Sequence, residues 1–87
     1  MAKTQVQTRP IYEIANDIIR DHKEQGRSLY FGAVPYVEAM QYLDKVTDYF
    51  GEDDAVSVLT YAVSNLGTWK GETARAVKKE IKAMLPW

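Results

Sequence analysis

The sequence lacks cysteine altogether and has a single histidine, His22. A chain without cysteine has no disulfides, no thiolate metal ligands and no cysteine nucleophile. One histidine without cysteine does not make a usual zinc site. We therefore expect no metal and no cofactor. His22 falls on the apolar face of a predicted helix, and we interpret it as a packed or boundary residue.

Catalytic patterns are missing as well. The sequence has no glycine-rich phosphate loop, no HExxH motif and no Ser/His/Asp constellation that spacing reveals. Nothing in the spacing of the carboxylates predicts a raised pKa of the kind that general acid–base catalysis uses. We therefore do not expect an enzyme.

Long apolar runs are also absent. No stretch approaches the roughly 20 apolar residues that span a bilayer. The opening residues, MAKTQVQTRP, lack the apolar core of a signal peptide. These features predict a protein of the cytoplasm that does not associate with a membrane.

An excess of charge of one sign is the last missing feature. The chain has 11 basic and 12 acidic side chains and a net charge of −1. Domains that bind nucleic acid through bulk charge are usually strongly basic. Nucleic-acid binding is therefore less expected than protein binding, although local basic patches remain.

The residues that are present predict one small helical domain. Hydrophobic residues make up 46% of the 87 residues and charged residues 26%, a balance typical of folded globular proteins. Apolar residues recur at helical spacing in four segments. We expect an all-α, compact single-domain bundle with helices at about 9–25, 35–50, 54–66 and 69–85. Residues 1–8 are expected to be a disordered N-terminus, and residues 9–87 form the domain.

Capping and stop residues set the expected helix boundaries. Thr8 is a candidate N-cap for the first helix and Asp53 for the third. Gly51 is expected to end the second helix, whose core face includes Phe50, and short links of two to five residues are expected around the third helix. The last helix begins either at Trp69 or only at Glu72. The apolar segment RSLYFGAV is expected to fold back onto the core through Leu29, Tyr30 and Phe31.

Two charged strips stand out on the predicted helices. The first helix carries Glu13, Asp17 and Asp21 at four-residue spacing, beside its apolar face. The last helix carries a basic strip made of Arg75, Lys78, Lys79 and Lys82. We expect these two helices to lie side by side and to pair their charges. The basic strip could instead contact phosphates as part of a helix-turn-helix, or be an ordinary solvated face. The segment has no Asn or Gln with which to read bases.

Several aromatic residues are expected on the surface, where tyrosine and tryptophan favour protein interfaces. The alternative is that they only cover the edge of a small core with their hydroxyl groups in water. The candidate interface residues are Val37, Tyr42, Tyr49, Tyr61 and Trp87.

Three segments resemble a group of small, mostly uncharacterised proteins encoded by bacteriophages and prophages of Gram-positive bacteria. They are IYEIANDIIRDH (11–22), YFGAVPYVEAMQYLDKV (30–46) and TWKGETARAVKKEIKAML (68–85). The resemblance implies a small all-helical accessory protein that acts in the bacterial cytoplasm, and it brings no catalytic residues. The Trp69 segment resembles a corner packed into the core. The sequence thus favours a non-enzymatic accessory protein that binds a host or phage protein, or a second copy of itself. A small DNA-binding regulator that uses the last helix is the alternative.

Overall fold

The computed structural model describes residues 6–87, and this part of the chain folds into four helices and one short hairpin, which confirms the predicted all-α class. The elements, in chain order, are α1 (Ile11–Glu24), α2 (Val34–Met40), β1 (Tyr49–Phe50), β2 (Asp53–Asp54), α3 (Ala55–Ser64) and α4 (Glu72–Met84). Residues 1–5, on which part of the expected disordered N-terminus falls, lie outside the described residues.

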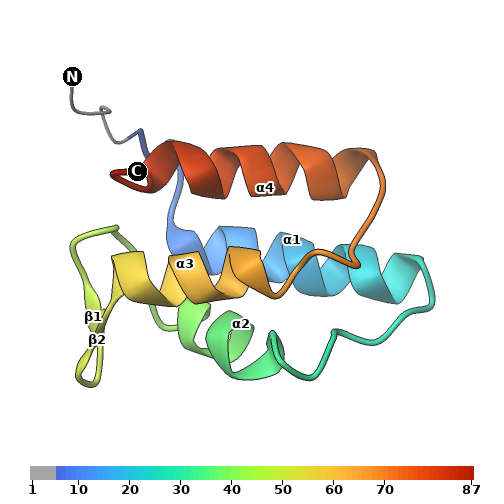
Figure 1. Cartoon of the computed structure of the whole chain (residues 1–87), viewed down its shortest axis with the longest axis horizontal. Helices are drawn as coiled ribbons and strands as arrows, with labels where there is room; N and C mark the ends of the chain where they lie inside the picture. Colours follow the sequence, from blue (N-terminus) through green and yellow to red (C-terminus); the bar gives the residue numbers. More distant parts are fainter. Residues whose placement is uncertain (1–5) are drawn as a thin grey trace.

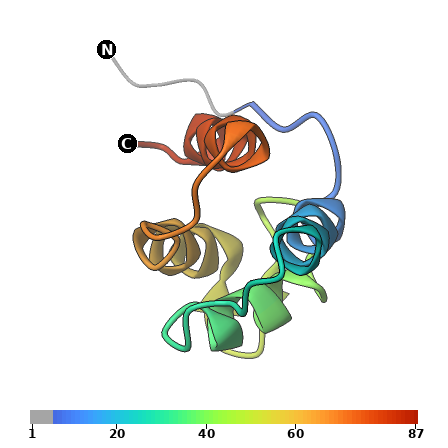
Figure 2. The same ribbon diagram turned by 90° about the vertical axis from the view of Figure 1, so that its right-hand side faces the viewer.

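The three longer helices lie side by side, and α2 crosses beneath two of them (Figure 1). Figure 2 views α1, α3 and α4 nearly end-on, as the corners of a triangle. Both α2 and α4 pack against α1 and against α3, so that they cover opposite sides of the α1/α3 pair. The bundle is therefore closed around one core.

The core is formed by the apolar faces that the sequence predicts for α1, α3 and α4. His22, the one buried polar residue among those described, stacks on the ring of Trp69 and lies with Nδ1 2.7 Å from the Ile18 carbonyl oxygen. Its interpretation as a packed residue is confirmed. The largest fully buried side chains are Ile11, Ile14, Ile18, Val37, Met40, Leu43, Leu59, Leu66, Ile81 and Met84.

Helix α2 is much shorter than the predicted helix over 35–50, because it ends at Met40. The carbonyl groups of Leu43 and Asp44 turn away to accept the first free N–H groups of α1, those of Tyr12 and Ile11, each at 2.9 Å. These N–H groups have no partner inside their own helix. The chain after α2 therefore caps α1, and the link between α2 and α3 is a long segment, not the predicted short one.

The hairpin lies where the sequence predicted the end of a helix. Gly51 has a φ of +63° and opens the two-residue turn between β1 and β2, a position that favours glycine in such turns. The N-cap of α3 is Asp54, whose side chain accepts a hydrogen bond from Ser57 N–H at 2.8 Å. The predicted N-cap, Asp53, is one residue too early.

Residues 6–9 form an ordered strap along α4, which contradicts the expectation of disorder for 6–8. Val6 N–H donates to the Ala83 carbonyl at 2.9 Å. The Gln7 amide donates to the Asp44 carbonyl at 2.6 Å and accepts from Val46 N–H at 2.9 Å. Thr8 does not cap α1, which begins after Pro10 without a side-chain cap.

The last helix begins at Glu72, the later of the two expected starts, because Gly71 takes a φ of +112° that breaks the helix before it. The segment from 65 to 71 holds Trp69, which is 2% exposed and donates its indole N–H to Asp21 at 2.7 Å. This confirms the corner predicted for Trp69.

The loop before α2 is packed tightly around Gly32. A Cβ added there would lie 2.6 Å from ring carbon Cε2 of Tyr30 and 2.8 Å from Oδ1 of Asn65. We predict that Gly32→Ala lowers the free energy of unfolding by about 1 kcal/mol, because one of these side chains has to move. The matched control is Gly67→Ala, where nothing lies within 4 Å and φ is not positive. It should raise stability by about 0.4–1 kcal/mol through the unfolded state. Urea unfolding measures both, and equal effects would contradict the packing around Gly32.

Candidate protein-binding surfaces

The turn after α2 and the strand β1 carry three exposed aromatic side chains, which we call the hairpin patch: Tyr42, Tyr49 and Phe50. Their exposed fractions are 76%, 68% and 41%. The rings of Tyr42 and Phe50 are in contact, with centroids 5.5 Å apart. Phe50 was expected in the core of the second helix. It is exposed because that helix ends early and the chain turns into β1. An exposed aromatic cluster of this kind is typical of protein-binding surfaces.

The segment of the chain that carries the hairpin patch, residues 38–54, is rich in carboxylates. Two of them serve the fold: Asp48 accepts from the N–H groups of Asp44 and Lys45, and Asp54 caps α3. These hydrogen bonds hold the pKa of Asp48 and of Asp54 below the ordinary aspartate value. Four other carboxylates are exposed and have no side-chain partner within residues 6–87. They form the acidic rim, which consists of Glu38, Asp44, Glu52 and Asp53.

Because the pKa of Asp54 is lowered in the folded protein, part of the folding stability is lost at acid pH. A carboxylate with a lowered folded-state pKa stabilises the fold above the ordinary aspartate pKa of about 3.9, and this contribution is lost as the pH falls through the folded-state pKa. We predict that Asp54→Asn keeps the cap, because asparagine caps equally well, but reduces the loss of melting temperature below about pH 4. The control is Asp53→Asn, whose carboxylate has no partner within residues 6–87. Identical acid profiles for both variants would contradict the prediction.

The other candidate interface residues do not join the hairpin patch into one surface. Val37 is fully buried in α2, so its assignment to an interface is wrong. Its position on the helix faces the core because α2 packs on both α1 and α3. Tyr61 is 54% exposed and stacks on Tyr36 across α2 and α3, at a ring distance of 5.3 Å. Trp87 is 69% exposed at the end of the chain.

The loop before α2 carries an exposed ring that the sequence placed on the core. Phe31 is 80% exposed and contacts only the ring of Tyr30 among the aromatic rings described. Leu29 alone of the three predicted residues packs against the core, and Tyr30 is 45% exposed. Tyr30 also lines a shallow pocket of about 260 Å³ with Ser64, Asn65, Gly67 and Thr68.

The residues of the basic strip of α4 do not share one environment. Lys78 is half-buried, and its ammonium group donates to the Trp69 carbonyl at 2.6 Å. Burial, together with the charges of Lys70 and Lys82, lowers the pKa of Lys78. Arg75 and Lys79 are exposed, and within residues 6–87 their side chains have no hydrogen-bond or ion-pair partner. Lys82 is also exposed.

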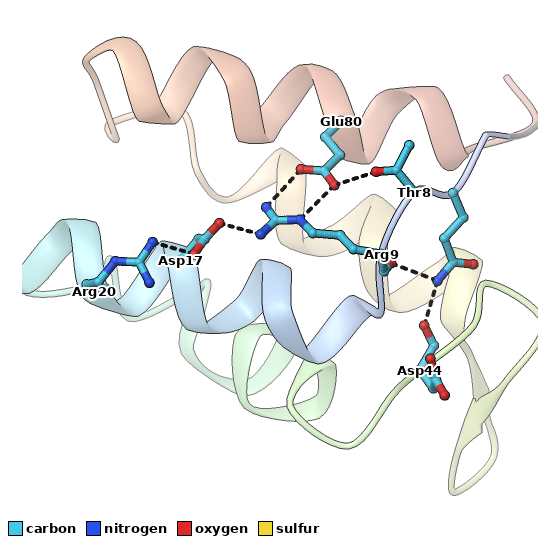
Figure 3. A network of polar contacts seen from close by, with 7 residues as sticks. Thr8, Arg9, Asp17, Arg20, Asp44 and Glu80 are labelled. Atoms are coloured by element: carbon cyan, nitrogen blue, oxygen red, sulfur yellow. Dashed lines mark hydrogen bonds and ion pairs between the residues drawn. The ribbon is translucent and has the colours of Figure 1, made fainter.

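Helices α1 and α4 do pack together, as expected, but Arg9 of the strap links them (Figure 3). Its guanidinium group donates two hydrogen bonds of 2.9 Å to Glu80 and lies 2.6 Å from an oxygen of Asp17. Asp17 also pairs with Arg20, and Thr8 donates to Glu80. The predicted pairing with the basic strip of α4 is wrong for Asp17, because this carboxylate pairs with Arg9 and Arg20. Asp21, the third position of that strip, accepts from Trp69 and Gln25.

An apolar groove runs between the strap and α4, with a volume of about 330 Å³. Its lining residues define what we call the strap groove: Val6, Thr8, Ala76, Lys79, Glu80 and Ala83. Val6 is 50% exposed there. No pattern in the sequence indicates this groove, because it forms only where the strap lies against α4.

Within residues 6–87, no three histidine or acidic side chains converge as metal ligands would. In the same residues no helix combines the length and the apolar character needed to cross a bilayer. Comparisons with protein-family models, curated proteins and solved structures gave no significant match.

Proposed function

We propose that this protein is a non-enzymatic accessory protein that binds another protein through the hairpin patch. The observation that carries the proposal is the exposed contact between Tyr42 and Phe50, with the exposed Tyr49 next to Phe50 in the sequence. Aromatic side chains give a large contact area at a low cost in side-chain entropy. The acidic rim supplies the polar border that such interfaces have, and it favours a partner with basic groups.

The cellular context of the proposal follows from the resemblance to small phage and prophage proteins. It supports a role in the bacterial cytoplasm during infection or lysogeny, with a host or phage protein as the partner. Modulation of a host component, such as a defence factor, would then result from covering part of that component's surface.

The test is capture of the partner by tagged protein from a bacterial lysate, with quantitative comparison of variants. Tyr42→Ser combined with Tyr49→Ser should reduce the captured partner at least tenfold. The matched control, Phe31→Ser, removes an equally exposed ring at the other end of α2 and should leave capture unchanged. Equal capture by the wild type and the double variant would reject the hairpin patch as the binding surface.

The alternative, a DNA-binding regulator, has the exposed Arg75 and Lys79 in its favour. Against it, seven residues, 65–71, separate α3 from α4, and a helix-turn-helix uses a turn of about 3–4 residues between crossed helices. Helices α3 and α4 instead lie side by side in both views (Figures 1 and 2). Lys78 is also occupied by the Trp69 carbonyl.

We predict no mobility shift of duplex DNA at about 50 mM salt, where phosphate contacts are strong. The control is the triple variant Lys78→Glu, Lys79→Glu and Lys82→Glu, which should behave like the wild type in this assay. A shift by the wild type that the triple variant loses would support the DNA-binding alternative.

A further inference from the structure

Two surfaces of this chain are opposite in charge, and each has an apolar part. The hairpin patch projects aromatic rings within an acidic rim, and the strap groove is an apolar hollow beside exposed cations. We propose that a second copy of this chain docks its hairpin patch into the strap groove of the first, in a head-to-tail contact. This inference rests on the proposed protein-binding function and names the partner.

The charges of the two surfaces are opposite. Residues 38–54 contain six acidic side chains and one lysine, a net charge of −5. Residues 70–82 contain five basic and two acidic side chains, a net charge of +3. Opposite potentials on two surfaces favour their encounter and fix the orientation of the complex. The hairpin patch of one copy is therefore attracted to α4 of another copy and repelled by a second hairpin patch.

The groove keeps a positive character although Glu80 lines it. Both oxygens of Glu80 accept hydrogen bonds from Arg9, so that this carboxylate is neutralised within the chain. Lys79 remains in the groove with no ion-pair partner within residues 6–87, and Arg75 lies one turn before it on α4. An incoming acidic rim meets cations that the fold has not already paired.

Two alanines of α4 form the apolar floor of the groove. Ala76 and Ala83 are seven residues apart and lie on one face of the helix, where their small side chains leave room for a ring. Val6 forms the facing wall, which the hydrogen bond from its N–H to the Ala83 carbonyl holds in place. Burial of rings against this floor supplies the favourable free energy of a small interface.

The two surfaces are available at the same time. In Figure 1, α4 lies along the top of the bundle and the hairpin lies at its lower left. A contact between two different surfaces is heterologous, and it continues into open chains of molecules or closes into a ring. The same chain uses both surfaces at once in such an assembly.

The first experiment measures the mass of the wild-type protein in solution by sedimentation, from about 1 µM to about 1 mM. We expect species larger than a monomer to appear with rising concentration at about 0.05 M salt, and to decrease at about 1 M salt. A protein that stays monomeric throughout overturns the second copy as the partner. Capture of a foreign protein through the hairpin patch would then still uphold the proposed function, so the two proposals fail separately.

The second experiment uses two variants that each lack one surface. The hairpin variant combines Tyr42→Ser with Tyr49→Ser, and the groove variant is Ala76→Glu, which places a carboxylate on the apolar floor where the rings would dock. All three positions are exposed, and circular dichroism confirms that each variant is folded. Each variant alone should be monomeric, whereas an equimolar mixture should form a one-to-one dimer and nothing larger.

The matched control for the groove variant is Thr73→Glu, an exposed residue of the same helix that does not line the groove. It should associate like the wild type. Self-association of either single-surface variant, or a mixture that stays monomeric, overturns the head-to-tail contact. Loss of association in the Thr73 variant also overturns it, because charge alone would then explain the effect.

Discussion

Trp69→Ala should cost about 3–5 kcal/mol of folding free energy, the usual range for removing a buried tryptophan. A chain of 87 residues is expected to have a total stability of roughly 4–13 kcal/mol. Trp69 is 2% exposed, stacks on His22 at 5.2 Å and donates to Asp21. Its removal leaves a cavity, exposes His22 and takes a donor from Asp21, so that the variant should melt at a clearly lower temperature than the wild type.

The measurement is thermal and urea unfolding followed by circular dichroism. Trp69→Phe keeps most of the ring but removes the indole N–H, and should lose clearly less than the alanine variant. Trp87→Ala is the matched control, because Trp87 is 69% exposed, and it should stay within about 0.5 kcal/mol of the wild type. A loss below about 1 kcal/mol in Trp69→Ala would contradict the role of this corner.

Ile18→Ala should be the second most damaging change, with a loss of about 2–5 kcal/mol. Ile18 is fully buried in α1, and its carbonyl also faces Nδ1 of His22. Its neighbour Ile19 is only partly buried and packs at the edge of the core. Ile19→Ala removes the same atoms from the adjacent position, and its loss should be less than half as large.

Urea unfolding of the two isoleucine variants gives the comparison directly. The unfolded chains differ only in the order of two residues, so that the difference in stability reports burial in the folded state. Equal losses would mean that both side chains are equally buried, which would contradict the orientation of α1 described above.

Helices α1 and α4 could be predicted because their apolar residues keep a helical period between clear stops. The core positions Ile14, Ile18, Val77 and Ile81 all lie where that period places them. The second helix could not be predicted over its full length. The segment after Met40 also has apolar residues at helical spacing, but its carbonyl groups are used to cap α1, an interaction with a distant part of the sequence.

The candidate surfaces were predicted in part. Tyr42 and Tyr49 are exposed as the helical wheel indicated, although they lie on a turn and a strand. Gly51 carried a signal for the hairpin, since glycine followed by a polar residue favours a two-residue turn, but the same glycine is also typical of a helix end. For this reason Phe50 was predicted to lie in the core, whereas it is exposed on the surface. The strap groove had no local signal, because Val6 meets α4 only in the folded chain.

The clasp formed by Arg9 and Glu80 joins residues 71 positions apart in the chain. Closing a loop of that length costs more entropy than forming any of the local helix contacts. The contact between Arg9 and Glu80 therefore stabilises the fold only after the helices are in place. We expect the strap to be the last part of the protein to fold and the first to exchange its amide hydrogens. The N–H of Val6 should therefore exchange well before that of Leu59, and each opening of the strap removes one wall of the groove while the helices remain intact.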